Sequence, residues 1–174
     1  MTVIKERMCA EPDAEVVVFL IGMRINKPWK IHKWLPMAFA MPRMLRELGL
    51  HPELGFLGGH TWFARTIIVL QYWRSVDALN AYAKNRNQAH LPAWAAFNRA
   101  VGTGCDVGIW HETYRVRAGD YETIYVNMPP FGLAKATKAV AASGRRESAA
   151  GRMNRSGPLP NLTNSSGEDD VKEA

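Results

Sequence analysis

The chain has 174 residues, with 22 Lys and Arg against 16 Asp and Glu and a formal net charge of +6. This modest basic excess comes without a basic stripe or a nucleic-acid-binding motif, so we expect no nucleic-acid partner. The two cysteines, Cys9 and Cys105, fit neither a disulfide framework nor a metal site. A signal peptide and an apolar run long enough to span a membrane are both missing, and we expect a cytoplasmic protein.

The two ends of the chain differ in composition from its middle. All the aromatic residues lie at or before Phe131, and residues 134–174 are rich in Ala, Gly, Ser and charged residues. Such a segment buries too little apolar surface to offset the entropy lost on ordering. We therefore expect a flexible lead over residues 1–13, one folded domain over 14–133 and a mostly disordered tail over 134–174.

The first half of the domain reads as a strand, a helix and a hairpin. Residues 15–25 are rich in β-branched side chains and predict a strand. Residues 29–48 carry apolar side chains at helical spacing. In that helix Pro36 is expected near the start, Pro42 is expected to kink or split it, and Gly49 to end it. Residues 53–63 and 64–73 predict two strands, with a turn in GGHTWFA.

The second half of the domain repeats the helix-and-strand pattern. Ser75 is the expected N-cap of a helix over residues 76–88, and Pro92 opens a second helix over 93–101. Strands are predicted over residues 106–116 and 122–126. The element order is therefore β-α-β-β-α-β with one small added strand, which is typical of an α+β ferredoxin-like fold: a four-stranded antiparallel sheet with two helical segments on one face.

Both faces of the predicted sheet are apolar. On residues 15–25 the alternating side chains are hydrophobic on each side, and residues 67–73 behave in the same way. A sheet covered by helices on one face only would leave the other apolar face in water. We therefore expect two sheets to pack face to face as a homodimer, which is a dimeric α+β barrel.

Six segments of the chain carry a family resemblance: FLIGMRIN, KWLPMAFAMPRMLREL, QYWRSVDALNAYA, HLPAWAAFN, VGIWHETYRV and YVNMPPFGL. They resemble antibiotic-biosynthesis-type monooxygenases, in the branch related to the fumagillin-pathway polyene-cleaving enzyme, over residues 15–133. The resemblance implies a dimeric barrel whose relatives carry out different reactions. Some oxidise electron-rich aromatics with O₂ and no cofactor, others bind and degrade haem, and the similarly folded aldoxime dehydratases use haem to remove water.

Three residues are the candidate catalytic groups. His90 lies at the expected start of a helix, where the positive end of the helix dipole favours the neutral imidazole, a form that can act as a base or ligate haem iron. Alternatively, His90 caps that helix. By the resemblance, Asn26 and Trp73 match by position an Asn and a Trp that hold substrate and oxygen in cofactor-free relatives. Without such a role, Asn26 is a turn residue and Trp73 packs in the core.

Other polar and aromatic residues are candidates for substrate binding. Arg24 lies on an apolar strand and either pairs with Glu112 or anchors an acidic substrate group. His111 and Glu112 are neighbours on one strand, so they point to opposite faces and only one of them can face a pocket. Trp94 and Trp110 could form an aromatic pocket wall.

Three functions remain open from the sequence. The first is a small monooxygenase-like enzyme that acts on a hydrophobic, electron-rich molecule in the barrel lumen and requires no cofactor. The second is a haem protein of dehydratase or haem-degrading type, with His90 or His111 as the axial ligand. The third is a non-catalytic binder of small apolar ligands.

Overall fold

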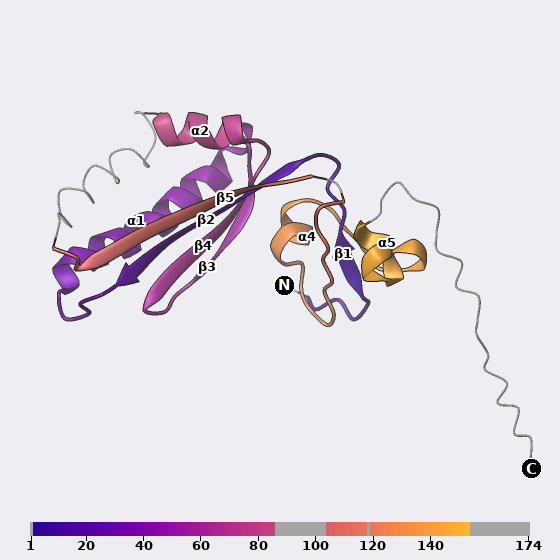
Figure 1. The fold of residues 1–174 in the computed structure, drawn as a ribbon, viewed down its shortest axis with the longest axis horizontal. Helices are drawn as coiled ribbons and strands as arrows, with labels where there is room; N and C mark the ends of the chain where they lie inside the picture. The colour runs from indigo at the N-terminus through magenta and orange to yellow at the C-terminus, as the bar shows by residue number, and fades with distance from the viewer. Residues whose placement is uncertain (1, 86–103, 118, 154–174) are drawn as a thin grey trace, which may run out of the picture.

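The computed structural model describes residues 2–85, 104–117 and 119–153 of the chain. It is an α+β protein with a four-stranded sheet in the order β3-β4-β2-β5, in which all neighbouring strands are antiparallel (Figure 1). The strands are β2 (Val16–Ile25), β3 (Phe56–Trp62), β4 (Thr66–Trp73) and β5 (Val107–Val116). This order confirms the predicted ferredoxin-like arrangement.

Helices α1 (Ile31–Leu50) and α2 (Val76–Lys84) cover one face of this sheet. Near one end, Met23 and Ile25 of β2 pack with side chains of the neighbouring strands and with Trp34 and Met37 of α1. Near the other end, Trp73 is buried with side chains of both helices. The residues of this second cluster are Val17, Leu48, Trp73, Leu79 and Tyr82. Alternate residues of β2 and β4, from Val17 to Ile25 and from Ile67 to Trp73, therefore face the helices.

Helix α1 runs through both of its prolines. Pro36 and Pro42 lie inside a single helix, so of the two predicted effects of Pro42, a kink or a split, the split does not occur, and the helix passes Gly49 to end at Leu50. Apolar side chains on both sides of the prolines, among them Trp34 and Met44, lie against the sheet. Tertiary packing of an apolar helix face outweighs local helix propensity here.

The predicted hairpin between β3 and β4 is present. Residues 58–62 of the segment GGHTWFA belong to β3, in agreement with the predicted strand over 53–63, and the turn lies at residues 63–65. A Cβ atom on Gly59 would lie 2.6 Å from the carbonyl oxygen of Leu70. Glycine is required there because the two backbones approach closely, so Gly59 marks a close contact between strands rather than a turn.

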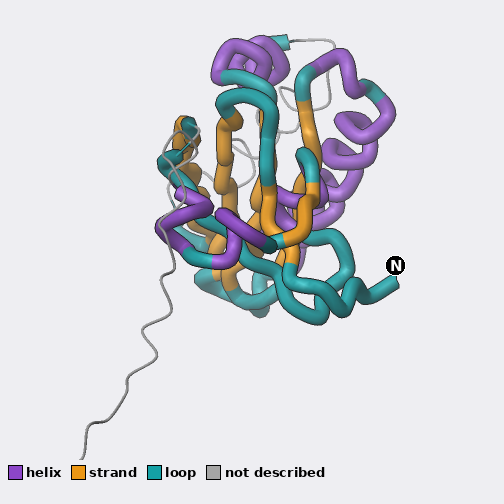
Figure 2. Tube along the Cα trace, turned by 90° about the vertical axis from the view of Figure 1, so that its right-hand side faces the viewer, coloured by secondary structure: helices purple, strands orange, loops and turns teal. Residues whose placement is uncertain are grey.

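Parts of both chain ends form strands and short helices in the structure. Strand β1 (Met8–Ala10) pairs with β6 (Ala139–Ala141), and α4 (Gly132–Ala136), a 3₁₀ turn η2 (Gly144–Glu147) and α5 (Ala149–Met153) lie beside them. A further 3₁₀ turn, η1 (Pro52–Leu54), follows α1. Figure 2 looks at the molecule from this end and shows the segment in front of the sheet.

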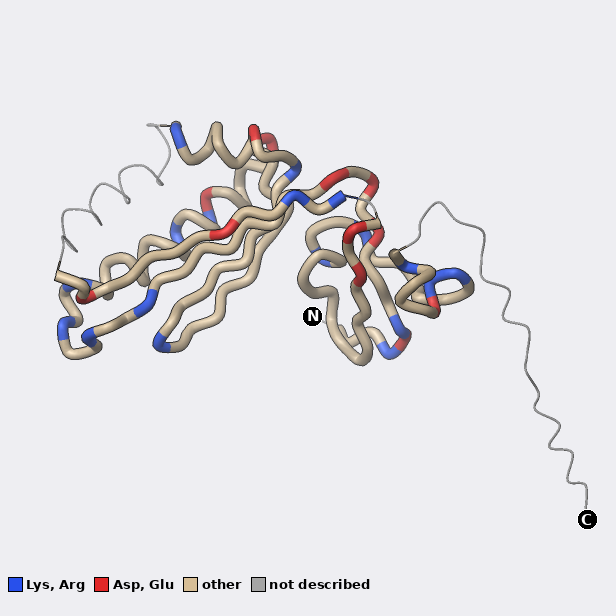
Figure 3. Tube along the Cα trace, in the orientation of Figure 1, with Lys and Arg blue, Asp and Glu red and all other residues tan. Residues whose placement is uncertain are grey.

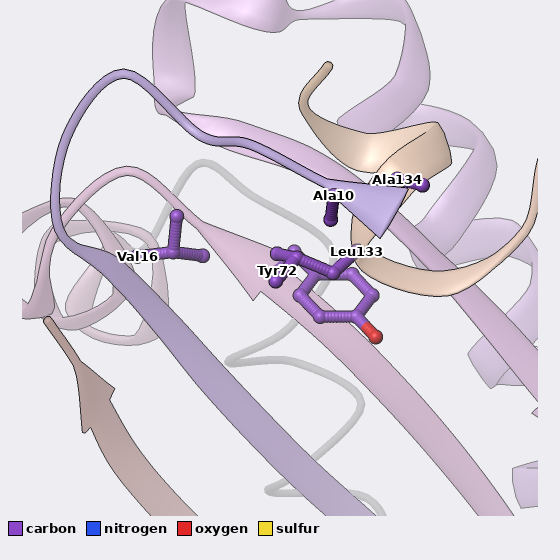
Figure 4. Close-up of a cluster of buried hydrophobic side chains, with 5 residues drawn as sticks. All are labelled: Ala10, Val16, Tyr72, Leu133 and Ala134. Atoms are coloured by element: carbon purple, nitrogen blue, oxygen red, sulfur yellow. The ribbon is translucent and has the colours of Figure 1, made fainter. Parts of the chain in front are cut away.

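The second face of the sheet is partly covered by this C-terminal segment. Leu133 and Ala134 of α4 pack with Val16, Tyr72 and Ala10 (Figure 4). A small number of apolar residues is therefore enough to hold the segment in place, because they pack against apolar side chains of the sheet. The predicted strand over residues 122–126 is absent from the described structure, where an isolated bridge joins Tyr125 to Met8.

Charged residues are sparse along the central strands, as Figure 3 shows. Within the described residues, none of the helices is long and apolar enough to cross a membrane.

A buried carboxylate joins the end of β2 to the start of β5. The Nζ atoms of Lys27 and Lys30 lie 2.8 and 2.9 Å from the Oδ1 and Oδ2 atoms of Asp106, whose side chain is 6% exposed. The backbone N–H of Asn26 also donates to the carbonyl of Asp106. Hydrogen bonds from Lys27 and then Lys30 lower the pKa of Asp106 to about 2.

We predict that Asp106→Asn removes an acid-sensitive part of the stability. The folded protein holds the Asp106 pKa at about 2, below the ordinary aspartate value of 3.8, so the carboxylate stabilises the fold above about pH 4. This contribution is lost as the pH falls from about 4 to 2. Thermal unfolding should therefore show a lower Tm for the variant at pH 6 and converging values near pH 2.

The matched control for this measurement is Asp13→Asn, because Asp13 is exposed. The Tm of this variant should equal that of the wild-type protein at every pH. If the Tm of Asp106→Asn equals that of the wild-type protein at pH 6, the two lysines do not stabilise the fold through this carboxylate.

Candidate active site between the sheet and the helices

A cavity of about 240 Å³ lies between the sheet and helices α1 and α2. Its wall is mostly apolar, and a small number of polar side chains interrupt it. This composition is typical of sites that bind small molecules. The described lining residues are Phe19, Ile21, Met41, Met44, Leu45, Leu48, Gln71, Trp73, Leu79, Asn80, Tyr82, Ala83, His111 and Thr113.

Strand pairing places the polar residues around Phe19 of β2. Phe19 lies opposite Gln71 of β4 on one side and opposite Thr113 of β5 on the other. The His111 ring, one pair further along β5, lies 5.9 Å from the Phe19 ring at an angle of 46°. An aromatic ring therefore lies between an amide on one side and a hydroxyl and an imidazole on the other.

Trp73 is a core residue that also reaches the cavity. Its side chain is fully buried, and its ring meets Phe56 edge-on at 5.5 Å. The indole Nε1 donates a hydrogen bond to Oε1 of Gln71 at 2.9 Å. The indole has one donor and no acceptor, so Trp73 cannot also donate to a bound molecule while this bond is made.

Tyr82 forms part of the wall and stays neutral. Its hydroxyl donates to Oε2 of Glu47 at 3.3 Å. Burial, followed by the charge and the hydrogen bond of Glu47, raises the pKa of Tyr82 well above its usual value. The phenol is therefore protonated at physiological pH and does not serve as a base.

The structure separates His111 from Glu112, as strand alternation requires. Both side chains are exposed, but His111 lies at the rim of the cavity, whereas Glu112 is on the opposite face of the sheet and accepts a hydrogen bond from the Tyr114 hydroxyl at 2.6 Å. Trp110 shares that opposite face. A Cβ atom on Gly22 would lie 2.3 Å from its Nε1 atom, so the indole packs on the β2 backbone.

Arg24 makes a different contact from the predicted one. It donates to the Thr66 hydroxyl at 3.2 Å. Arg24 lies opposite Gly108 on β5, whereas Glu112 lies opposite Leu20. Four residues along a strand correspond to about 13 Å, so the predicted Arg24–Glu112 ion pair is wrong.

Asn26 and Trp73 lie at opposite ends of the sheet. Trp73 pairs with Val17, nine residues from Asn26 along β2, which corresponds to about 30 Å. The Asn26 amide donates to the carbonyl of Cys105 at 3.1 Å. Cys105 has a φ of 53°, in the left-handed region, so this bond holds a strained turn. The two residues therefore do not form one site, and Asn26 is a turn residue.

Two predicted site residues, His90 and Trp94, lie outside the described residues. Within the described structure, the predictions missed Gln71, Thr113 and Phe19. The sequence held a signal for Gln71, because it is in phase with Val69 and Trp73 on an otherwise apolar strand. Thr113 lies beside Phe19 because β2 pairs with β5. This pairing could not be predicted from the sequence around either residue.

The described residues of the cavity offer few of the groups that hold haem in proteins. His111 could ligate iron, but the described part of the wall contains neither Lys nor Arg to pair with the two haem carboxylates. Nor do the described residues include a cluster of three His, Cys, Asp or Glu side chains that could hold a metal ion.

The fold and the cavity together define an α+β protein of ferredoxin-like type with a mostly apolar cavity between its sheet and its helices. The chain belongs to the monooxygenase af470-like family, whose model matches residues 16–133. This confirms the predicted monooxygenase branch.

Monooxygenase af470 of Aspergillus fumigatus is 27% identical over 129 residues, which cover 69% of this chain and 46% of the relative. The chain thus spans about half the length of the curated relative that it matches. An aldoxime dehydratase (OxdRE) in complex with butyraldoxime has a TM-score of 0.59 at 16% identity, over 72% of this chain and 38% of its own. A second aldoxime dehydratase has a TM-score of 0.52 at 17% identity, over 86% and 43%. These two similarities show the fold alone.

Proposed function

We propose that the protein is a small oxygenase that binds a hydrophobic, electron-rich molecule between its sheet and its helices. The observation that carries the proposal is the cavity of about 240 Å³, in which an imidazole lies at the edge of an apolar, aromatic surface. Membership of a monooxygenase family supports the reaction class. The site proposed here is formed by one chain, whereas the sequence favoured a lumen between two.

His111 is the proposed base. A neutral imidazole that faces the cavity can accept the O–H proton of a bound phenol or enol. The resulting anion passes one electron to O₂, and the substrate radical and superoxide then combine to form a C–O bond. Loss of water converts a CH₂ group into a carbonyl. One O₂ accepts four electrons from the substrate and leaves one oxygen atom in it and one in water, so no external reductant or cofactor is needed. His90 stays a sequence-based candidate for the same role.

A second copy of the chain is the proposed partner of the open sheet face. Trp62 and Tyr114 are 42% and 50% exposed on this face, and Leu20 and Ile68 are partly exposed between them. Self-association would remove this apolar surface from water.

We predict that His111→Gln lowers oxygen uptake about 10²- to 10⁴-fold with a substrate found by screening phenols and polyenes. Glutamine keeps a polar side chain at the cavity but cannot accept a proton near neutral pH. The measurement is the initial rate of oxygen consumption in an electrode chamber.

The matched control is His60→Gln, because His60 lies on β3 and packs against Trp62 and Phe131, away from the lining of the cavity. Its rate should equal that of the wild-type protein. Unchanged turnover in His111→Gln would exclude the imidazole as the base. Binding without oxygen uptake across the panel would favour a ligand-binding protein.

Hemin titration separates the haem alternative from the cofactor-free oxygenase. The proposal expects no shifted Soret band on addition of hemin to the full-length protein. A Soret shift that disappears in His111→Gln would favour the haem protein instead.

We predict that the protein elutes with the mass of two chains in size-exclusion chromatography with light scattering. Ile68→Lys places a charge on the open sheet face and should give a monomer. The control is Phe39→Lys, because Phe39 is 70% exposed on α1, and this variant should stay dimeric. A monomeric wild-type protein would contradict the proposed partner and leave the one-chain cavity intact.

A further inference from the structure

We propose that Gln71 recognises an oxygen atom of the substrate and that Trp73 is the positioning residue that aims the Gln71 amide. The inference rests on the proposed function for the location of the site and adds to it the group that selects the substrate. The substrate class that fits is a flat apolar molecule with an acceptor oxygen, such as a ketone.

The hydrogen bond from Trp73 fixes which end of the amide faces the cavity. Oε1 of Gln71 accepts the Trp73 indole proton at 2.9 Å. Because an indole nitrogen can only donate, the amide oxygen and not the amide nitrogen must face it. Trp73 is fully buried and packed against Phe56 and Tyr82, so this donor is held in place. The NH₂ group of Gln71 is thereby turned away from Trp73.

The NH₂ group of Gln71 is available to a ligand. Gln71 is only 8% exposed, and its side chain lines the cavity. In the described part of the chain, its one side-chain hydrogen bond is that to Trp73. The proposal therefore has this NH₂ group facing the cavity, which the Gln71 side chain lines. A buried donor without a partner is energetically costly, so a bound molecule that supplies an acceptor oxygen would bind more tightly.

The positions of Gln71 and His111 define how a substrate could lie. Both flank Phe19, one on β4 and the other on β5. Strands two apart are separated by about 10 Å, which a flat molecule resting on the Phe19 ring can span. Removal of a proton beside His111 would give an anion whose charge spreads to the oxygen beside Gln71. A donor already aimed at that oxygen stabilises the anion.

The test uses two small probes of the same frame, 1-tetralone and tetralin, which differ by one carbonyl oxygen. Isothermal titration calorimetry gives the affinity of the full-length protein for each. We expect 1-tetralone to bind about three- to tenfold more tightly than tetralin, as one net hydrogen bond provides. Gln71→Leu keeps a similar volume without a donor, and it should abolish this preference while tetralin affinity is retained.

Trp73→Phe tests the positioning role. Phenylalanine preserves an aromatic ring in the core but frees the Gln71 amide to rotate. The ratio of the affinity for 1-tetralone to that for tetralin should therefore fall towards one. A purely structural role of Trp73 would lower the affinity for both probes equally and leave their ratio unchanged. The control is Tyr72→Phe, which removes one hydroxyl from the neighbouring residue on the opposite face and should leave the ratio as in the wild-type protein.

Two outcomes overturn the inference in distinguishable ways. If both probes bind and the Gln71→Leu variant keeps the wild-type ratio, Gln71 does not recognise the oxygen, while the proposed function stands. If neither probe binds to the wild-type protein, the cavity is not a site for such molecules, and both this inference and the proposed function are wrong.

Discussion

The alternation of side chains along β2 is the constraint on which the rest of the structure depends. This strand pairs with β4 on one side and with β5 on the other. Its register therefore determines which side chains of all three strands point towards the helices. A shift by one residue would move Phe19 and Val17 out from under the helices. If β5 kept its pairing with the inverted β2, Glu112 would take the place of His111 at the cavity. The register of β2 therefore determines both the packing of the fold and the residues that line the cavity.

The sequence predicted the sheet and its helices well, because hydrophobic periodicity is a local property. The continuity of α1 through its prolines and the structure of residues 134–153 were not predictable in the same way. In α1, packing on the sheet overrides two prolines, and in the C-terminal segment the short side chains around Leu133 are buried only because Tyr72 and Val16 provide a surface for them. Both outcomes depend on contacts between residues far apart in the sequence.

The candidate site was only partly predictable, for a related reason. Alternation showed that His111 and Glu112 face opposite ways, but only the register against β2 shows that His111 is the one at the cavity. Asn26 and Trp73 looked like a pair by position, yet the antiparallel order sets them at opposite ends of the sheet. Gln71 carried a local signal, a polar residue in phase with buried ones, whose meaning depends on the hydrogen bond from Trp73.

The central claim is that substrate binds on the helix-covered face of the sheet within one chain. A crystal structure of the full-length protein soaked with 2-naphthol tests it most directly. The account predicts electron density for the ring system against Phe19, between Gln71 and His111. Density on the opposite face, beside Trp110 and Glu112, with an empty cavity under the helices, would contradict it.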